Sequence, residues 1–327
     1  MDPGCGHRMM SGTRFAFIDI GTNTILCLIA ELKKDGTFEV LDDLAEITRL
    51  GQGVDQTSRI SSEGEERSCE VLQRYLDRCK HLGVEEIVAA GTSALRDAEN
   101  RGEVRARFRE KLGLEVRILS GEEEAAYSYL AVQKGLSLAG ELLVIDVGGG
   151  STEFIRGNEK AVTEAVSIDV GSVRLTERFL HSDPVRAEEC EQMVTIIDQR
   201  LAPLRERWLK EAPALTFVGI AGTFTTLAAV EKGLTRYSHS EVHGSCLTLN
   251  EVERQVRLFQ QLTIAERRKI PGLEPERADV ILAGATLIER IMKLFQGGQV
   301  VVSDQGVRYG LLHERLERLQ SKRLQSC

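Results

Sequence analysis

The chain of 327 residues is long enough for two domains, and its composition, 42% hydrophobic and 28% charged, is that of an ordinary globular protein. The net charge of −8 argues against nucleic acid and against an anionic membrane surface as partners. No apolar run approaches the ~18 residues of a membrane span, so we expect no membrane partner.

The first residues, MDPGCGHRMMSG, lack the apolar segment of a signal peptide, and we predict a disordered tail over residues 1–13. The seven cysteines are odd in number and scattered, without a C-x-x-C pair. That pattern argues against a disulfide framework or a zinc site and favours a reduced cytoplasm.

Residues 14–135 are predicted to form a first α/β domain. The strand FAFIDI, a turn at Gly21–Thr24 and the strand ILCLIAEL make a hairpin at its start. An amphipathic helix follows over residues 63–83, with apolar side chains at helical spacing and Gly83 at its end. The remaining elements are the strand EEIVAAGT, the helix NRGEVRARFREKLG, the strand EVRILS and the helix SGEEEAAYSYLAVQKG.

The pattern then restarts. The stretch LLVIDVGGGSTEFI resembles the first hairpin, with Asp146 in the place of Asp19 at an offset of 127 residues. A second internal match aligns AAGTSAL with IAGTFTTL at an offset of 131 residues. Two matches in the same order predict an internal duplication, and the alternative is two unrelated units that share turn chemistry.

A second α/β domain is predicted over residues 136–310, with helical additions, and a C-terminal helix over residues 311–327. After the second hairpin come a long helix over residues 187–209, the strand TFVGIAGT, further helices and the strand QVVVSD. Strands that alternate with helices, opened each time by a hairpin, indicate two α/β domains. A cleft between two such domains is a natural ligand site.

The glycine-rich turn in DVGGGST admits several roles. The chain has no Gly-Lys dipeptide and therefore no P-loop, and the strand-like TEFIRG after the glycines disfavours a Rossmann turn. Glu153 stands where a nucleophile elbow needs glycine, so Ser151 is not expected to be an acyl nucleophile. What remains is a tight turn whose amides converge on an anion, or a purely structural hairpin.

Acids and further loops extend this predicted phosphate site. Asp146 and Glu153 suit Mg²⁺, which prefers one or two carboxylates together with water and phosphate oxygens. The equivalent turn after Asp19 would grip the same phosphate chain from the other side. The loop GTSALRDAEN carries small hydroxyl residues and an arginine, and GIAGTFTTLA places Gly222 and Thr223 before a helix, whose N-terminus favours an anion.

Three consecutive glutamates open the helix after ILSG. Ser120 and Glu123 fit the capping box S-x-x-E, which gives Glu123 a structural role, and Glu122 is expected to be solvated. Glu124 has room beside the small Ala125. A carboxylate near a helix N-terminus stays ionised and could orient a water for attack on phosphorus. The residues alone do not decide firmly among the three.

Two other features are weaker candidates. His239 and His243 in HSEVH are four residues apart, which is metal-ligand spacing, but without H-E-x-x-H solvated or capping roles are favoured. The basic run ERRKIPG is expected to be a solvated helix end, in which Arg267 could still face an anion.

Taken together, these stretches resemble the exopolyphosphatase/guanosine pentaphosphate phosphatase (Ppx/GppA) family of the actin-like ATPase superfamily, from about residue 15 to residue 312. The matching stretches are IDIGTNT, GTSALRDAEN, ILSGEEEA, VIDVGGGSTE, DVGSVRLTERF, IAGT, LTIAERRKIPGLEPERADVILAGA and VSDQGVRYG.

The resemblance implies two ribonuclease H-like domains with a phosphate cleft between them. It makes Glu124 the base that activates water, and Mg²⁺ would be held by Asp146, Glu153 and Asp19. The residues expected to bind phosphate are Gly21, Thr22, Asn23, Thr92, Ser93, Arg96, Gly148, Gly149, Gly150, Ser151, Gly222 and Thr223.

The implied activity is Mg²⁺-dependent hydrolysis of the terminal phosphate of inorganic polyphosphate, by a short two-domain member that is expected to be a homodimer. The first alternative is a guanosine pentaphosphate (pppGpp) 5′-phosphohydrolase, although Leu26 stands where members active on that compound carry arginine. A sugar kinase or ATPase of the same superfamily and a non-catalytic polyphosphate or nucleotide sensor are further alternatives. The last matching stretch, VSDQGVRYG, also differs from the family pattern: Val307 and Tyr309 stand where the family usually has the Leu and Glu of L-R-E-G.

Overall fold

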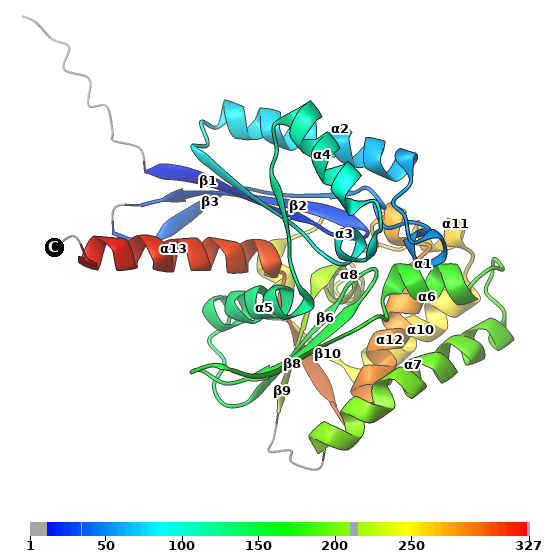
Figure 1. The fold of residues 1–327 in the computed structure, drawn as a ribbon. Helices are drawn as coiled ribbons and strands as arrows, with labels where there is room; N and C mark the ends of the chain where they lie inside the picture. The colour runs from blue at the N-terminus through cyan, green and yellow to red at the C-terminus, as the bar shows by residue number, and fades with distance from the viewer. Residues whose placement is uncertain (1–11, 34, 210–214, 326–327) are drawn as a thin grey trace, which may run out of the picture.

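The computed structural model describes residues 12–33, 35–209 and 215–325. The tail predicted over residues 1–13 lies outside this range except at its end, where Thr13 already belongs to the first strand. Two sheets with helices around them form the molecule, which confirms the predicted α/β class (Figure 1).

The first sheet has the strand order β3-β2-β1-β4-β5. The hairpin β1 (Thr13–Ile20) and β2 (Thr24–Leu32) is antiparallel, as predicted, and β3 (Phe38–Ile47) pairs antiparallel with β2 at the edge. The strands β4 (Glu86–Gly91) and β5 (Val116–Ile118) run parallel to β1. Its helices are α1 (Val54–Thr57), α2 (Ser62–His81), α3 (Ser93–Asp97) and α4 (Arg101–Leu112).

The second sheet has the order β10-β11-β9-β6-β7-β8. Its strands are β6 (Leu142–Val147), β7 (Thr152–Gly157), β8 (Val162–Ile168), β9 (Thr216–Ile220), β10 (Cys246–Thr248) and β11 (Gln299–Val302). Its helices are α6 (Ser172–Phe179), α7 (Ala187–Leu209), α8 (Ala221–Glu231), α9 (His239–Val242), α10 (Leu249–Gln261), α11 (Ile264–Arg267) and α12 (Ile281–Leu294), with a 3₁₀ turn at Pro275–Arg277.

The duplication predicted from the sequence is visible as a repeated topology. In each half three antiparallel strands follow one another, and the first of them then pairs in parallel with a strand that comes later in the chain. Asp19 and Asp146 occupy equivalent places near the end of the first strand. Each hairpin turn therefore emerges at the same edge of its sheet, where the carboxyl ends of the parallel strands lie.

Two helices lie between the sheets. The helix α5 (Gly121–Gly135) packs Tyr127 and Ala131 with β1 and with the C-terminal helix α13 (Val307–Gln325). Its other face packs with β6, β7 and β9. Figure 1 shows α5 and α13 side by side between the two sheets. The C-terminal helix thus begins at Val307 and not at residue 311, and it returns to the first sheet.

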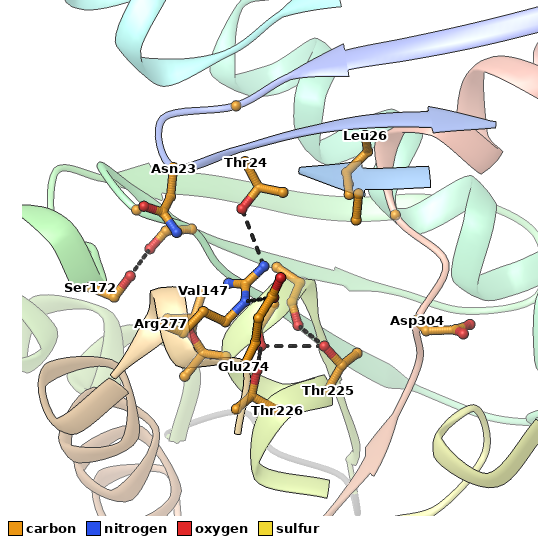
Figure 2. A pocket seen from close by; sticks show the side chains of 18 of the residues that line it. Asn23, Thr24, Leu26, Val147, Ser172, Thr225, Thr226, Glu274, Arg277 and Asp304 are labelled. Carbon is orange, nitrogen blue, oxygen red and sulfur yellow. Dashed lines mark hydrogen bonds and ion pairs between the residues drawn. The ribbon is translucent and has the colours of Figure 1, made fainter. Parts of the chain in front are cut away.

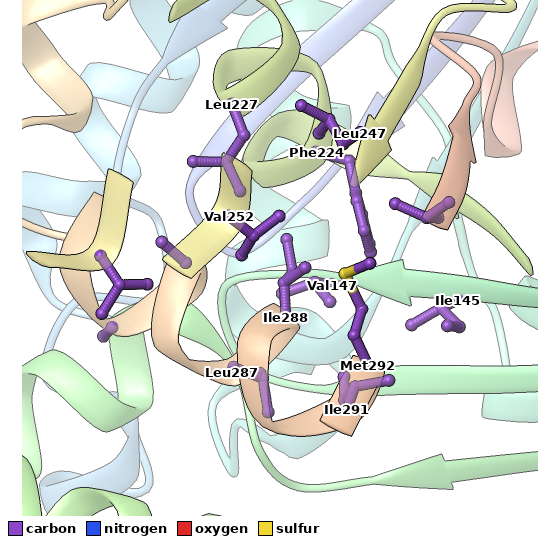
Figure 3. Packing of buried hydrophobic residues seen from close by; sticks show 14 of the residues in the cluster. Ile145, Val147, Phe224, Leu227, Leu247, Val252, Leu287, Ile288, Ile291 and Met292 are labelled. Carbon is purple, nitrogen blue, oxygen red and sulfur yellow. The ribbon is translucent and has the colours of Figure 1, made fainter. Parts of the chain in front are cut away.

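The largest hydrophobic core lies in the second half, behind the end of β6 and the start of α8. Side chains of α8 and α12 pack with Ile145 and Val147 of β6, as Figure 3 shows for Phe224, Ile288 and Met292. Because interiors of this kind are close-packed, the end of β6 and the start of α8 are fixed relative to each other.

Some elements were not predicted. The strands β3, β8 and β10 were missed, whereas the predicted helix over residues 187–209 matches α7 at both ends. Among the residues that the structure describes, no helix is long and apolar enough to cross a membrane. The five cysteines in the described ranges are all free thiols.

Candidate active site

The turns of the two hairpins face one cavity of about 540 Å³ between the halves. They also touch each other. A Cβ atom on Gly150 would lie 2.5 Å from the Ser93 Oγ, and one on Gly149 would lie 3.1 Å from the Thr22 Cβ. Glycine is therefore required here because the loops of the two halves approach too closely for side chains.

The first turn leaves polar groups open. The Gly21 amide donates to the Thr24 carbonyl at 3.0 Å, and the Asn23 carbonyl accepts from the amides of Thr48 and Arg49. The side-chain Nδ2 of Asn23 and the Oδ1 of Asp19 are buried without a hydrogen-bond partner. Both residues line the cavity. A buried polar group without a partner is costly, and a ligand in the cavity would supply the missing partners.

The second turn is held by the start of α6. The Gly148 amide donates to the Ser151 carbonyl at 3.0 Å, and the amides of Ser172 and Val173 donate to the carbonyls of Gly148 and Gly149. Within the described residues the amides of Gly149 and Gly150 donate to no acceptor of the chain. Two such amides in a glycine turn form a concave donor set that suits an anion.

The acids of the second hairpin have partners. Asp146 accepts from the Ser128 hydroxyl at 2.9 Å. Glu153 accepts from the hydroxyls of Ser151 at 2.8 Å and Ser167 at 2.7 Å, and only 1% of its surface is exposed. Asp146 lines the cavity, whereas Glu153 lies behind its wall. The assignment of Glu153 to a metal therefore stays a prediction without a contact to the cavity.

The structure separates the three glutamates that the residues alone left undecided. Ser120 and Glu123 form the predicted capping box, with hydrogen bonds of 2.9 and 3.1 Å. Glu122 is exposed. Glu124 is buried and lines the cavity. Geometry thus selects Glu124, independently of any family resemblance.

Arg96, predicted to bind phosphate, pairs with Glu124 in the structure. Its Nη1 donates to Glu124 Oε2 at 2.8 Å and to the Leu119 carbonyl at 3.3 Å, and the side chain does not line the cavity. Burial raises the pKa of Glu124, and the Arg96 hydrogen bond opposes that rise. Arg96 therefore favours the ionised form of this carboxyl group.

The carboxylates around the cavity perturb one another. Burial, with the charges of Glu124 and Asp146, raises the pKa of Asp19 to about 8. Burial and the charge of Glu124 raise the pKa of Asp146 to about 7, against the Ser128 hydrogen bond. The pKa of Glu153 is raised for the same reasons. Perturbed carboxylates in a cavity indicate a functional site, and a bound cation would relieve their repulsion.

Asp19 and Asp146 are suited to Mg²⁺ by their chemistry, since the ion takes one or two carboxylates and fills its remaining positions with water and phosphate. The free Asp19 Oδ1 is a ready oxygen ligand. Within the described ranges no group of three or more His, Cys, Asp or Glu side chains is arranged to hold a metal by itself. A metal there would thus depend on oxygen ligands from outside the chain.

Of the residues predicted for this site, those that line the cavity are Asp19, Gly21, Thr22, Asn23, Thr92, Ser93, Glu124, Asp146, Gly148, Gly149, Gly150, Ser151, Gly222 and Thr223. Arg96 and Glu153 do not. Arg267, which could have faced an anion, is instead buried and donates to the carbonyls of Phe259 and Ala278.

Sequence reasoning missed Arg277, which joins the halves at the cavity wall. Its Nη2 donates to Thr24 Oγ1 at 3.2 Å and its Nε to Glu274 Oε2 at 3.1 Å (Figure 2). A Cβ atom on Gly222 would lie 2.2 Å from the Arg277 guanidinium, so Gly222 leaves space for this arginine. The signal was present in GLEPERAD, inside a stretch that matches the family.

A second missed group closes the cavity on the side of α13. Arg308 forms a buried bidentate ion pair with Asp43 of β3, at 2.8 and 3.0 Å. The Tyr309 hydroxyl donates to the same carboxylate at 3.0 Å. His239 and His243 both pair with Asp304, which the sequence did not single out. His243 stands at the C-cap of α9, as the capping interpretation allows, and neither histidine is simply solvated, because both side chains pair with Asp304.

The chain is similar to known proteins over most of its length. The model of the Ppx/GppA phosphatase family matches residues 28–319. Exopolyphosphatase 2 of Mycobacterium tuberculosis is 36% identical over 296 residues, which is 87% of this chain and 91% of that protein. The crystal structure of the Aquifex aeolicus Ppx/GppA family member is 34% identical and superposes with a TM-score of 0.77 over 95% of this chain and 98% of that one.

A relative of different length also matches. The bifunctional 3-dehydroquinate synthase/phosphatase of Fusobacterium nucleatum is 32% identical over 313 residues. These cover 92% of this chain but only 46% of that protein, so the chain spans about half of this relative's length. The predicted fold, two ribonuclease H-like domains with a cavity between them, is confirmed by the superposition on the family structure.

Proposed function

Since the chain belongs to the Ppx/GppA phosphatase family, and is therefore a hydrolase of the phosphatase type, we propose that it removes the terminal phosphate of inorganic polyphosphate. The observation that carries the proposal is the position of Glu124. It is the one glutamate of its triplet that lines the cavity, opposite two phosphate-type loops that belong to different halves. Relatives named exopolyphosphatase match across most of the chain and support the choice of substrate.

In this proposal the chain supplies a base and an anion cradle. Glu124 takes a proton from the attacking water, whose oxygen bonds to the terminal phosphorus while the bridging P–O bond breaks and the remaining polyphosphate leaves with its electron pair. Arg96 keeps the glutamate ionised and fixed. The amides of Gly149 and Gly150 and the side chain of Asn23 stabilise the charge on the transferring group. Their positions are set before the substrate binds, because each turn is held by its own half.

Asp19 and Asp146 are the residues that would hold Mg²⁺, which when bound offsets phosphate charge. The unpartnered Asp19 Oδ1 and the raised pKa values of both acids support this assignment. Without a cation these two carboxylates would repel a polyanion. Because both carboxylates line the same cavity as the two glycine turns, a cation is needed there for a polyanion to bind.

A guanosine pentaphosphate 5′-phosphohydrolase is the second candidate. The observation that favours it is the apolar part of the cavity wall, which includes Leu234, Tyr237 and Leu273. A polyphosphate chain makes no use of such a surface, whereas a nucleobase would pack against it. Leu26 at the place of an arginine weighs against it.

Phosphate release tests both candidates. We expect the protein with Mg²⁺ to release phosphate from short polyphosphate, long polyphosphate or guanosine pentaphosphate. Glu124→Gln should lower the rate by about 10²- to 10⁴-fold, as loss of a general base does. Glu122→Gln is the matched control, since this exposed neighbour in the same helical turn should leave the rate unchanged.

The outcomes separate the hypotheses. No release from any of the three substrates would overturn the enzyme proposal in favour of a non-catalytic sensor. Equal rates for Glu124→Gln and Glu122→Gln would remove the assigned base. The ratio of rates on polyphosphate and pentaphosphate decides the substrate. The homodimer and the cytoplasmic location stay predictions.

A further inference from the structure

The wall of the cavity beside α9 carries charges that the proposed hydrolysis does not use. Asp304 follows β11, and Figure 2 shows it across the cavity from Asn23 and Ser172. Its side chain is 6% exposed and pairs with two histidines, with Nδ1 of His239 and with Nδ1 of His243, the latter at 3.1 Å. A nearly buried carboxylate thus holds two imidazoles.

The two histidines differ in whether the ring nitrogen Nε2 has a partner. The Nε2 of His243 lies 3.2 Å from the Gly135 carbonyl, so both nitrogens have partners and the ring is structural. His239 lines the cavity, half of its side chain is exposed, and among the described residues only its Nδ1 has a partner. Tyr237 packs edge-on against this ring at 5.1 Å between centroids. His239 therefore presents Nε2 from a fixed ring.

Other charged groups face the same region. Arg308 of α13 is committed to Asp43 of β3 and to the Asp304 carbonyl at 3.1 Å, so this pair cancels its own charge. Arg236 lines the cavity, is exposed, and makes no ion pair or hydrogen bond within the part of the chain that the structure describes. Arg236 and His239 line the same cavity and are three residues apart in the chain, and a guanidinium together with an imidazole held by a carboxylate is a donor set for an anion.

The charge of this wall depends on pH. The hydrogen bond to Asp304 raises the pKa of His239, against burial, and it raises the pKa of His243 as well. These two bonds hold the pKa of Asp304 below its usual range although burial opposes them. With both rings protonated, Asp304 and its two histidines carry a net charge of +1. As pH rises and both protons leave, the net charge becomes −1.

We propose that His239, held by Asp304, forms with Arg236 a second anion subsite that binds phosphate groups of the substrate other than the one hydrolysed. The inference rests on the proposed function and extends it, because a hydrolase that acts at one end of a polyanion must hold the remaining charge elsewhere. The ligand chemistry is a phosphate chain, whether from inorganic polyphosphate or from a nucleoside polyphosphate. Protonated His239 binds it and neutral His239 does not.

Binding to the Glu124→Gln protein, which leaves the ligand intact, tests the subsite. Tripolyphosphate and guanosine pentaphosphate are each titrated calorimetrically with Mg²⁺ at slightly alkaline pH, in two buffers of different ionisation enthalpy. We expect His239 to contribute proton uptake on binding, because the anion stabilises the imidazolium, while ionisation of Asp19 and Asp146 on Mg²⁺ binding releases protons in every variant. Adding His239→Gln should abolish that part of the uptake and weaken binding about 5- to 10-fold, the order expected for an exposed charge-assisted hydrogen bond.

Two further variants sharpen the result. His81→Gln is the matched control, since His81 is exposed at the end of α2, and it should keep both affinity and proton uptake. Arg236→Gln should weaken binding without changing the proton uptake, because arginine does not titrate. Equal weakening for both ligands assigns the subsite to the phosphate chain, and an effect confined to the pentaphosphate assigns it to that compound's additional phosphates.

Failure of the inference differs from failure of the proposed function. If the Glu124→Gln protein binds neither ligand, the proposed function itself is refuted. If the Glu124→Gln protein binds a ligand, and adding His239→Gln gives the same affinity and proton uptake as adding His81→Gln, the subsite is refuted while the hydrolase proposal stands.

Discussion

The two hairpin turns occupy equivalent places in a repeated topology, yet their acidic residues differ in their hydrogen-bond partners. In the second hairpin Asp146 faces Glu153 across the strands, and both acids accept hydrogen bonds from serines. In the first hairpin Asp19 faces Leu26, which has no polar group to offer, and the Asp19 Oδ1 has no partner. The acids of the hairpin thus have hydrogen-bond partners in the second half, whereas the acid of the first half keeps an unpartnered oxygen.

The difference indicates a division of labour between the turns, in which the second binds phosphate through backbone amides and the first binds a cation and phosphate through side chains. The second turn presents backbone amides from a loop that the chain has already fixed, whereas the first presents side-chain atoms that only a ligand can satisfy. Electrostatic stabilisation is strongest when donors need no rearrangement, which suits the second turn. The first turn, with its free carboxylate oxygen and free amide, suits a cation and an anion that arrive together.

The largest expected effect concerns the acids. Asp19→Asn and Asp146→Asn should each lower phosphate release by about 10²- to 10³-fold, the magnitude of removing one stabilising group. Asp19→Asn should also need more Mg²⁺ for half-maximal rate, because it replaces a carboxylate whose Oδ1 has no partner among the described residues. A Mg²⁺ titration of the rate measures both effects. Asp42→Asn, which alters a carboxylate paired with Arg78, is the control. Equal Mg²⁺ requirement in parent and Asp19→Asn would contradict the division of labour.

A smaller effect is expected where the turns touch. Gly150→Ala would place a methyl group 2.5 Å from the Ser93 Oγ and force the loops of the two halves apart. Misplacement of reacting groups by about 1 Å can cost about 10²-fold, so we expect a 10- to 100-fold loss in kcat/KM. Gly102→Ala has open space around it and should change nothing. An unaltered rate in Gly150→Ala would show that the loops need not be in contact.

Asn23→Ala and Ser151→Ala should separate binding from stability. Asn23→Ala removes a donor without an internal partner, so KM should rise by about 10-fold while the melting temperature changes little. Ser151→Ala removes one of the two donors to buried Glu153 and should destabilise the fold by about 1–2 kcal/mol. Steady-state kinetics and thermal unfolding of both variants measure this. Equal shifts in KM and melting temperature for the two would contradict it.

The smallest effect is on stability as a function of pH. The pKa values of Asp19, about 8, and Asp146, about 7, are raised above the unfolded value. The folded state therefore holds protons that the unfolded state has lost, and the metal-free protein should become less stable as pH rises from about 4 towards 8. Mg²⁺ favours the ionised forms, so its stabilisation should grow over the upper part of that range, by a few degrees. Asp146→Asn should melt higher than the parent at alkaline pH without Mg²⁺ and respond less to it. A Mg²⁺ shift independent of pH would argue against these ligands.

Local patterns in the sequence predicted the hairpins, because a strand, a glycine turn and a second strand are set by neighbouring residues. The capping box also followed from its spacing, and it removed Glu123 from the candidates. The residues could not choose Glu124, because its burial depends on how α5 sits between the sheets. Arg308 with Asp43, and His239 with Asp304, are partners that lie 265 and 65 residues apart. Such pairs carry no local signal. The acid-rich edge strand β3 was missed because its residues do not alternate clearly between apolar and polar.

The position of α5 has a consequence for cooperativity. One face of this helix belongs to the core of the first sheet and the other to the core of the second. Unfolding of either sheet would leave an apolar face of α5 in water, at a cost that the remaining contacts of so short a helix do not offset. We therefore expect the chain to melt in a single calorimetric transition despite its two sheets, with the van't Hoff enthalpy close to the measured one. Glu124, in the first turns of that helix, would then be among the last groups exposed by local opening.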